Sequence, residues 1–210
     1  GATNAARSLR YWETMVRWVT GADFGSPVKT RYIDGDKCVF RHDDDRCTFD
    51  PEVVRQEAVS IMNNWHPDAI LLSDYDKGLL TTDFIRKVVG YCAGRCIPCV
   101  ADAKREPSVY KGCIVKSNQE WMTRYWRTVR HSAEFSNWMV VTIGSEYPSI
   151  WNDGWRYTEN TSNMPPVKCV NHVGAGDCFA EHLTLALAYG FSLKEAAAVA
   201  HSAGRVYVKK

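Results

Sequence analysis

The chain has 210 residues with 26 basic and 24 acidic side chains, which gives a formal net charge of +2. This balance argues against a nucleic-acid surface and against an acidic tail, and 45% hydrophobic residues are enough for one domain with its own core. No apolar run approaches the roughly 20 residues of a membrane span, and the start of the chain lacks the pattern of a signal peptide. We therefore expect a cytoplasmic protein with neither a membrane segment nor a nucleic-acid partner.

Eight cysteines are spread along the chain, mostly inside predicted strands or helices. The one cluster, Cys92-x3-Cys96-x2-Cys99, has no second pair and no histidine at the spacing of a zinc finger. We expect reduced thiols and no metal site built by the protein itself.

The first part of the chain predicts a helix followed by a β-hairpin. Residues 1–7 contain a Gly-x-x-Asn pattern ending at Asn4 and lead into a helical pattern. Between positions 27 and 43 two short alternating strands flank Asp34-Gly35-Asp36, a turn in which glycine supplies a positive φ. The hairpin carries three cations, at Lys29, Arg31 and Arg41.

The middle of the chain alternates helices with short apolar strands. Asp50-Pro51 is a helix N-cap followed by proline, so a helix should run to about Trp65. The apolar runs 69–73 and 97–101 are too short for helices and indicate buried parallel strands, with a helix between them that Thr81 or Thr82 begins. This order predicts a parallel sheet with helices on both faces.

Polar segments follow these strands, at the sheet edge where open α/β sheets bind ligands. They are 73–78 (S-D-Y-D-K-G), 102–104 (D-A-K), 116–121 (K-S-N-Q-E-W), which begins a further helix, and 142–145 (T-I-G-S), which ends the strand 138–142. A hairpin over 149–158 comes next, and a capping box at Ser192 and Glu195 opens the last helix, to about Val206.

Residues 171–179 (N-H-V-G-A-G-D-C-F) stand between an extended segment, 165–170, and an apolar helical run, 180–189. Two glycines let the backbone approach an anion closely, and the first N–H groups of the helix point at it along the positive end of the helix dipole. Asp177 inside this turn would place a proton acceptor beside a transferring phosphoryl group, which is the chemistry of a kinase base. The alternative is a turn that only begins a helix.

Two of these segments resemble a known family. The glycine-rich turn resembles the D-T-T-G-A-G-D-T-F-x-A signature of the ribokinase-like (PfkB) sugar kinases, and 73–78 resembles the S-D-Y-x-K-G segment of the bacterial heptose-7-phosphate kinases. The resemblance implies a ribokinase-like three-layer α/β sandwich with a mainly parallel sheet. It also implies a single kinase domain over 1–210, with the hairpin 27–43 as a small β lid.

The function implied by the resemblance is ATP-dependent phosphorylation of a sugar hydroxyl, with ATP and Mg²⁺ as cofactors. The expected substrate is a heptose 7-phosphate or a related phosphorylated sugar, with transfer to O1 giving a bisphosphate. Asp177 would be the catalytic base, and the N–H groups of Gly174, Ala175 and Gly176 would hold the charge that develops on the phosphoryl group.

Further binding residues are implied in the same way. Thr142 and Gly144 match a T-x-G turn that contacts the nucleotide. Asn118 and Glu120 match a P-N-x-x-E segment near the ATP phosphates and the magnesium water shell. Here, however, Glu120 follows Asn118 by two residues rather than three, and Trp121 takes the acidic position. A plain helix N-cap at Asn118 is the alternative.

On the sugar side, Asn4 matches the Asn of a G-G-x-x-N-x-A segment that reaches the sugar. Lys29, Arg31 and Arg41 would bind the phosphate of the sugar from the lid, and a homodimer through the lid is compatible with the resemblance. The alternatives are an ordinary polar residue at Asn4 and a solvated basic face on the hairpin.

Family members begin with a strand ending in a D-x-x-L-D-x-Y-like segment, whereas this sequence opens at the helix expected after it. We therefore expect the N-terminal strand to be missing, the sugar side to be incomplete and turnover to be slow.

Two other functions stay open: a degenerate relative that binds nucleotide or sugar without turnover, and a Rossmann-like binding domain. The lack of G-x-G-x-x-G after a predicted strand argues against dinucleotides, and the lack of G-x-x-x-x-G-K-[ST] argues against a P-loop enzyme.

Overall fold

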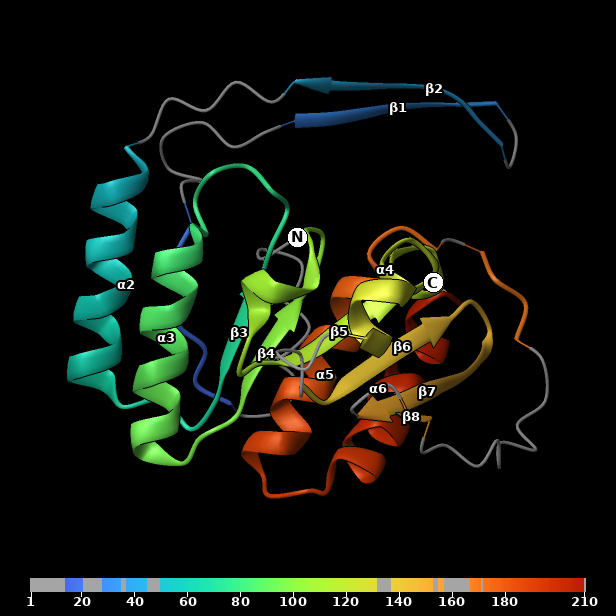
Figure 1. Ribbon diagram of the computed structural model, residues 1–210. Helices are drawn as coiled ribbons and strands as arrows, with labels where there is room; N and C mark the ends of the chain where they lie inside the picture. The colour runs from blue at the N-terminus through green and yellow to red at the C-terminus, as the bar shows by residue number, and fades with distance from the viewer. Residues whose placement is uncertain are drawn as a thin grey trace. The chain divides into compact units, whose positions relative to one another are not determined.

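A computed structural model describes residues 14–20, 28–34, 37–44, 50–131, 137–152, 155–156, 167–170 and 172–209. The chain forms two compact units (Figure 1). One contains a six-stranded sheet with α3 to α6, and the other contains the hairpin β1–β2, the helix α2 and the short segment Lys77–Leu79.

The main sheet has the strand order β3-β4-β5-β6-β7-β8, with β3 to β6 parallel and β7 and β8 antiparallel. The strands are β3 (Ile70–Ser73), β4 (Cys99–Asp102), β5 (Ile114–Asn118), β6 (Met139–Ile143), β7 (Glu146–Asn152) and β8 (Trp155–Arg156). This confirms the mainly parallel α/β sheet predicted from the sequence.

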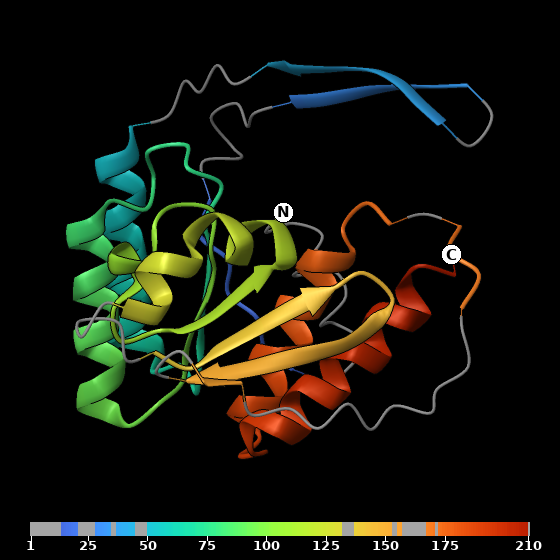
Figure 2. The same ribbon diagram turned by 45° about the vertical axis from the view of Figure 1, so that its right-hand side comes forward.

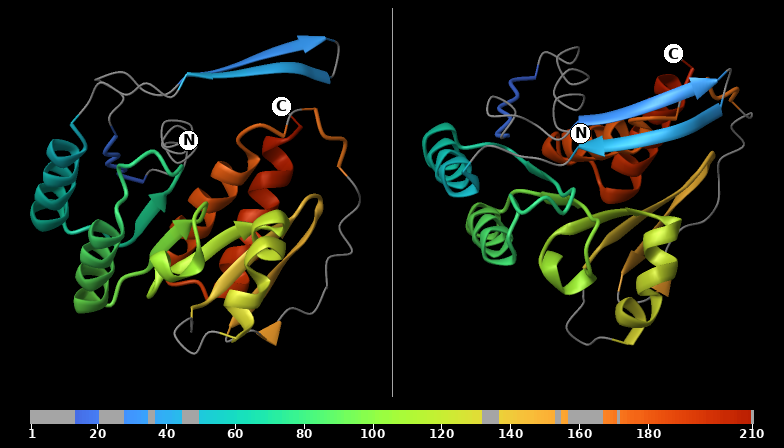
Figure 3. Two further views of the ribbon diagram at one scale, coloured as in Figure 1. Left: turned by 45° about the horizontal axis from the view of Figure 1, so that its top comes forward. Right: turned by 90° about the horizontal axis from the view of Figure 1, so that it is seen from above.

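Helices cover both faces of this sheet. α3 (Thr82–Arg95) and α4 (Gln119–His131) lie on one face, and α5 (Ala175–Ala188) and α6 (Leu193–Tyr207) lie side by side on the other (Figures 2 and 3). The three layers follow from the right-handed crossovers that join parallel strands.

The core between the sheet and the α5–α6 pair uses small residues on α6 and larger ones elsewhere. Ala196, Ala197 and Ala200 of α6 are completely buried, as is Leu183 of α5. Because alanine side chains are short, α6 can approach α5 closely, and Val100 and Val140 fill the space on the sheet side.

Local capping signals begin the helices where the sequence predicts them. Oδ1 of Asp50 accepts the N–H of Glu52 at 2.8 Å at the start of α2, and Oγ1 of Thr81 accepts the N–H of Phe84 at 3.2 Å at the start of α3. The capping box at the start of α6 is also formed.

The second unit contains the predicted hairpin. β1 (Val28–Asp34) and β2 (Lys37–Asp44) pair antiparallel, with Arg31 opposite Arg41 and a bulge at Tyr32 and Ile33. The unit also contains α2 (Pro51–Trp65), whose bounds agree with the predicted helix.

Of the expected extended segment, the described residues 167–170 belong to no helix or strand, and the N–H of Val170 donates to the carbonyl of Val208 at 2.8 Å. Two boundaries differ from the expectations. α5 begins at Ala175 rather than at 180, because Gly174 takes a positive φ of 88° and caps it. The strand β7 begins at Glu146, because Gly144, with a φ of 53°, turns β6 directly into β7. Within the described residues, no helix is long and apolar enough to cross a membrane.

Candidate active site

The carboxyl ends of the parallel strands and the first turn of α5 bring together the polar segments singled out in the sequence. Asp74 and Tyr75 follow β3, Asp102 ends β4, and Asn118 ends β5. Asp177 lies in the first turn of α5. Segments far apart in the sequence therefore meet at one edge of the sheet.

The most direct contact joins the two family-like motifs. The hydroxyl of Tyr75 donates a hydrogen bond of 2.6 Å to Oδ1 of Asp177, across a separation of 102 residues. A phenol that donates to a carboxylate makes a short, charge-assisted hydrogen bond and fixes the orientation of the carboxylate. The acid of the glycine-rich turn is thus oriented by the S-D-Y segment.

The glycine-rich turn is held from outside by α6. A Cβ atom at Gly174 would lie 2.5 Å from the hydroxyl oxygen of Tyr207, and the φ of 88° at this position also favours glycine. The same hydroxyl donates to the carbonyl of Val173 at 3.1 Å. Burial raises the pKa of Tyr207, and the nearby charges of Cys178 and Asp177 raise it further, so this phenol remains a donor.

The first N–H groups of α5 are not equivalent. The N–H of Ala175, expected to face the phosphoryl group, donates to the carbonyl of His172 at 3.1 Å and so closes the turn. Gly176 and Asp177 follow it in the first turn, at the positive end of the helix dipole. These two N–H groups are the stronger candidates for binding an anion.

A buried ion pair lies beneath the turn. Nζ of Lys116 lies 3.0 Å from Oδ1 of Asp102, and each side chain is only 4% exposed. A Cβ atom at Gly176 would lie 3.1 Å from this ammonium group. Nζ of Lys104 approaches the other oxygen of Asp102 at 3.6 Å and lies 5.7 Å from the centre of the Tyr75 ring.

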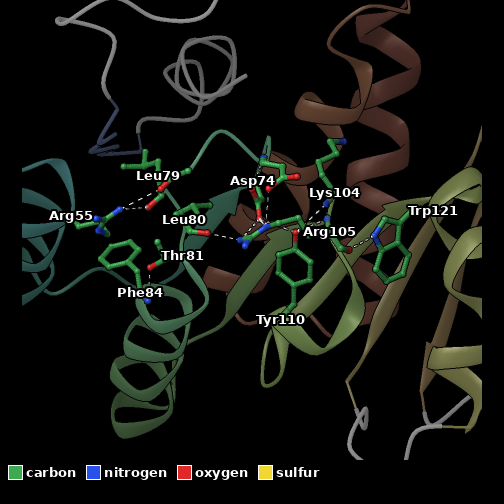
Figure 4. A network of polar contacts seen from close by, with 12 residues as sticks. Arg55, Asp74, Leu79, Leu80, Thr81, Phe84, Lys104, Arg105, Tyr110 and Trp121 are labelled. Carbon is green, nitrogen blue, oxygen red and sulfur yellow. Dashed lines mark hydrogen bonds and ion pairs between the residues drawn. The ribbon is translucent and has the colours of Figure 1, made fainter. Parts of the chain in front are cut away.

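Asp74 is the centre of a second, structural network (Figure 4). Its side chain is 2% exposed, and Oδ2 accepts hydrogen bonds from Nε and Nη2 of Arg105 at 2.8 and 2.7 Å and from the hydroxyl of Tyr110 at 2.8 Å. Oδ1 accepts the N–H of Asp76 at 2.7 Å. Every oxygen of this buried carboxylate is therefore hydrogen-bonded, as burial of a charge requires.

The Asp74 network joins several loops on the binding edge of the sheet. Arg105 also donates to the carbonyl of Leu80, and its own carbonyl accepts the indole N–H of Trp121 at 2.7 Å. Burial alone would lower the pKa of Arg105, but the hydrogen bond and charge of Asp74 raise it. Burial also raises the pKa of Tyr110, so both groups keep their protons.

The segment expected near the nucleotide phosphates has local partners. Oδ1 of Asn118 accepts the N–H of Trp121 at 2.8 Å and thus caps α4. The carboxylate of Glu120 is 77% exposed and pairs with Arg124 at 3.2 Å. The indole of Trp121, at the family's acidic position, is buried against Arg105 rather than directed at a ligand.

Thr142 and Gly144 lie at the end of β6, beside this segment. Thr142 is the register partner of Asn118, and its hydroxyl donates to the carbonyl of Ser117 at 3.1 Å. The structure therefore brings Asn118, Thr142 and the first turn of α5 to the same edge of the sheet.

The structure describes the residues expected to bind the sugar only in part. Asn4 lies outside the described residues. Lys29, Arg31 and Arg41 lie on β1 and β2, in the other compact unit, and only their backbone positions are described.

The sequence did not reveal how Tyr75, Asp102, Lys104 and Lys116 contact the glycine-rich turn, although each stands in one of the polar segments that follow the strands. The signal was available: the carboxyl ends of neighbouring parallel strands meet at one edge, so charged residues that end β4 and β5 should lie together.

No group of three or more His, Cys, Asp or Glu side chains that could hold a metal ion occurs in the part of the chain that the structure describes. The cysteines whose side chains are placed are all free thiols: Cys92, Cys96, Cys99, Cys113, Cys169 and Cys178. Reduced cysteines agree with the expectation from the sequence.

No protein-family model matches the sequence. Several curated proteins are similar to it. The bifunctional protein HldE of Caulobacter vibrioides is 29% identical over 197 residues, which cover 87% of this chain and 40% of that protein. HldE of Syntrophotalea carbinolica is 30% identical over 202 residues, with the same coverage of 87% and 40%. The chain thus spans well under half the length of these relatives.

Solved structures share the fold. The apo adenosine kinase of Trypanosoma brucei brucei superimposes with a TM-score of 0.64 at 15% identity, covering 89% of this chain and 65% of that one. The ribokinase of Thermotoga maritima gives a TM-score of 0.59 at 16% identity, covering 81% and 59%. The Arabidopsis thaliana ribokinase complexed with ribose and ATP gives 0.55 at 18% identity, covering 73% and 53%.

Proposed function

Because this chain is a member of the ribokinase-like (PfkB) family of carbohydrate kinases, we propose that it transfers the terminal phosphoryl group of ATP to a sugar hydroxyl. The observation that carries the proposal is the hydrogen bond between Tyr75 and Asp177. It joins the two motifs most typical of the family, and it orients the one acid that stands at the N-terminus of α5.

The proposed reaction assigns one task to each part of the turn. Asp177 accepts the proton of the sugar hydroxyl, whose oxygen forms a bond to the terminal phosphorus while the bond to the bridging oxygen breaks and ADP leaves. The N–H groups of Gly176 and Asp177, at the positive end of the α5 dipole, stabilise the charge on the phosphoryl oxygens.

Mg²⁺ enters this proposal bound to ATP. Carboxylate and amide oxygens suit Mg²⁺, but Glu120 is paired with Arg124 and Asn118 caps α4. In the proposed reaction neither side chain is a ligand of the metal.

For the acceptor we propose a heptose 7-phosphate or a related sugar phosphate, with transfer to O1. The support is the likeness of residues 73–78 to the heptose-7-phosphate kinase segment, together with the cations at Lys29, Arg31 and Arg41 of the hairpin. A homodimer through the hairpin is part of the proposal. Tyr32, Val39 and Phe40 are 54%, 64% and 59% exposed and would supply its apolar contact, which analytical ultracentrifugation can test.

The test is an ADP-release assay with a panel of phosphorylated and unphosphorylated sugars, applied to the wild type and to Asp177→Asn. Loss of the general base should lower kcat by about 10²-fold to 10⁴-fold while ATP binding stays close to that of the wild type. Asp83→Asn, on the exposed start of α3, removes the same charge and should keep full activity. Equal turnover by Asp177→Asn and the wild type would exclude Asp177 as the base.

A second function, binding of nucleotide or sugar without turnover, is favoured by the local pairing of Asn118 and Glu120. The same assay separates the two. If calorimetry detects ATP binding but no sugar in the panel releases ADP, the chain is a binding protein.

A further inference from the structure

The buried pair beneath the glycine-rich turn is unusual for its position. A helix N-terminus carries a partial positive charge and repels a cation, yet Lys116 places an ammonium group 3.1 Å from the Cβ position of Gly176, in the first turn of α5. Such a placement is costly unless an anion compensates it. Asp102, at 3.0 Å, supplies one negative charge.

Asp102 is, however, shared by two lysines. Its Oδ1 pairs with Lys116 at 3.0 Å, and its Oδ2 pairs with Lys104 at 3.6 Å. Asp102 alone therefore offsets only one of the two ammonium charges, and the next carboxylate is that of Asp177 in the first turn of α5. When Asp177 accepts the proton of the substrate hydroxyl, one positive charge of the pair is left to attract the oxygens of a phosphoryl group.

The two lysines differ in their freedom to move. Lys116 is 4% exposed and fixed, whereas the Lys104 side chain is 41% exposed and held by a long contact. Figure 4 shows the Lys104 side chain extending away from Tyr110, while its backbone N–H donates to the hydroxyl of Tyr110. The backbone of Lys104 is thus anchored and its ammonium group is the mobile part.

Lys104 is also connected to the base. Its ammonium group lies 5.7 Å from the centre of the Tyr75 ring, and the hydroxyl of Tyr75 donates to Asp177. Contacts therefore run from Asp177 through Tyr75, Lys104 and Asp102 to Lys116, whose ammonium group lies 3.1 Å from the position that a Cβ atom of Gly176 would take. The mobile cation is part of a chain of contacts beside the glycine-rich turn.

We propose that Lys104 leaves Asp102 to bind the oxygens of the transferred phosphoryl group, while Lys116 stays paired with Asp102 and supports the turn from beneath. Lys104 is then a phosphoryl-binding residue, and Lys116 is a positioning residue that acts through Gly176. This inference rests on the proposed kinase function and adds to it specific roles for Lys104 and Lys116.

The decisive measurement is the affinity for ATP relative to ADP, since only ATP carries the phosphoryl group that Lys104 would bind. In titration calorimetry with Mg²⁺, Lys104→Met should weaken ATP binding by about 10-fold to 100-fold, the worth of a charge-assisted hydrogen bond, and leave ADP binding within about 3-fold. Lys104→Arg should restore most of the preference for ATP. Lys87→Met, on the exposed surface of α3, is the matched control and should change neither affinity.

The role of Lys116 has its own test. Gly176 has an ordinary helical φ, so Gly176→Ala strains no backbone, and its new methyl group meets only Lys116. Gly176→Ala should therefore weaken ATP binding, and adding Lys116→Met should remove most of the difference that the alanine makes. If the effects of the two substitutions on the free energy of ATP binding are additive, the role assigned to Lys116 is overturned.

The outcomes separate this inference from the proposed function. If sugar phosphorylation persists but Lys104→Met keeps the wild-type ratio of ATP to ADP affinity, the inference alone is overturned. If Lys104→Met instead weakens only the binding of the sugar phosphate, Lys104 binds the phosphate already on the sugar, and the inference is also overturned. If the wild-type chain binds neither ATP nor ADP, the proposed function and this inference are both overturned.

Discussion

At the scale of single residues, Tyr75 is the group that connects the acid of α5 to the rest of the sheet edge. A carboxylate that must accept a proton from a substrate hydroxyl works only in a narrow range of orientations, because hydrogen bonds weaken steeply away from linearity. The 2.6 Å bond from Tyr75 restricts that range for Asp177.

Removal of the Tyr75 hydroxyl should therefore slow the reaction without weakening nucleotide binding. We expect Tyr75→Phe to lower kcat about 10-fold and to leave the KM for ATP unchanged, because the phenol contacts the base and not the nucleotide in the proposed reaction. Steady-state kinetics of Tyr75→Phe beside Tyr91→Phe, a tyrosine on α3, checks this. A kcat equal to that of the wild type would show that Asp177 does not depend on Tyr75.

At the scale of elements, the Asp74 network holds the ends of β3, β4 and α4 together. Asp74→Asn keeps the shape of the side chain but takes away the buried charged partner of the Arg105 guanidinium group, which is 20% exposed and keeps only a longer contact, of 3.6 Å, with the exposed Asp76. Breaking a buried ion pair from one side typically costs about 3 to 5 kcal/mol. We expect a loss of this order in the free energy of unfolding measured with urea.

Asp76→Asn is the matched control for that change. Asp76 is 66% exposed and lies 3.6 Å from the same guanidinium group, so its pair contributes less than about 1 kcal/mol. Asparagine also tolerates the positive φ of 55° at this position. Equal losses for the two variants would mean that burial of the Asp74 pair contributes nothing.

The packing of α6 against β7 makes stability depend on pH through His201. The ring of His201 is 6% exposed and lies 5.3 Å from the ring of Tyr147, edge to face. Burial, with a smaller effect of the charge on Arg205, lowers the pKa of His201 below its ordinary value of 6.5. The folded chain therefore keeps this ring neutral, whereas the unfolded chain protonates it below about pH 6.5.

The difference in protons bound by the unfolded and folded chains sets the direction in which stability changes with pH. The contribution of His201 to stability is complete above about pH 6.5 and decreases as the pH falls below it, because the unfolded state then binds the extra proton. His201→Phe keeps the ring contact and removes the titration. The free energy of unfolding between pH 7.5 and pH 5.5 should fall less in His201→Phe than in the wild type, and parallel curves for the two would contradict the assignment.

At the scale of the whole molecule, short sequence patterns such as caps and turns predicted the architecture. They did not predict which distant residues contact one another. Some features depend only on residues that are neighbours in the sequence, so they could be predicted from it directly. They are the hairpin, the caps of α2 and α3 and the capping box of α6. The glycine-rich turn was also recognisable, since its glycines and its acid lie within a few positions of one another.

The rest of the site depends on how distant segments meet. No local pattern tells that the phenol of Tyr75 reaches Asp177, or that Lys116 occupies the space beside Gly176. The start of α4 shows a second limit of local patterns: the motif assigns Asn118 to the nucleotide, while its side chain also accepts the N–H of Trp121 at the start of the helix. A capping amide and a ligand-binding amide look the same in a sequence.

The Asp74 network and the contact between Tyr75 and Asp177 differ in how much of the chain must be synthesised before their hydrogen bonds can form. The bonds of the Asp74 network span at most 36 residues, whereas the Tyr75 bond to Asp177 spans 102. A ribosome delivers the chain from its N-terminus at about 5 to 20 residues per second, and contacts between distant segments cost more chain entropy to form. The scaffold of β3, β4 and β5 can therefore settle while α5 is still being synthesised. During that interval the nascent chain has the framework of the site without its acid, and the acid arrives on the last helical pair to a place already prepared for it.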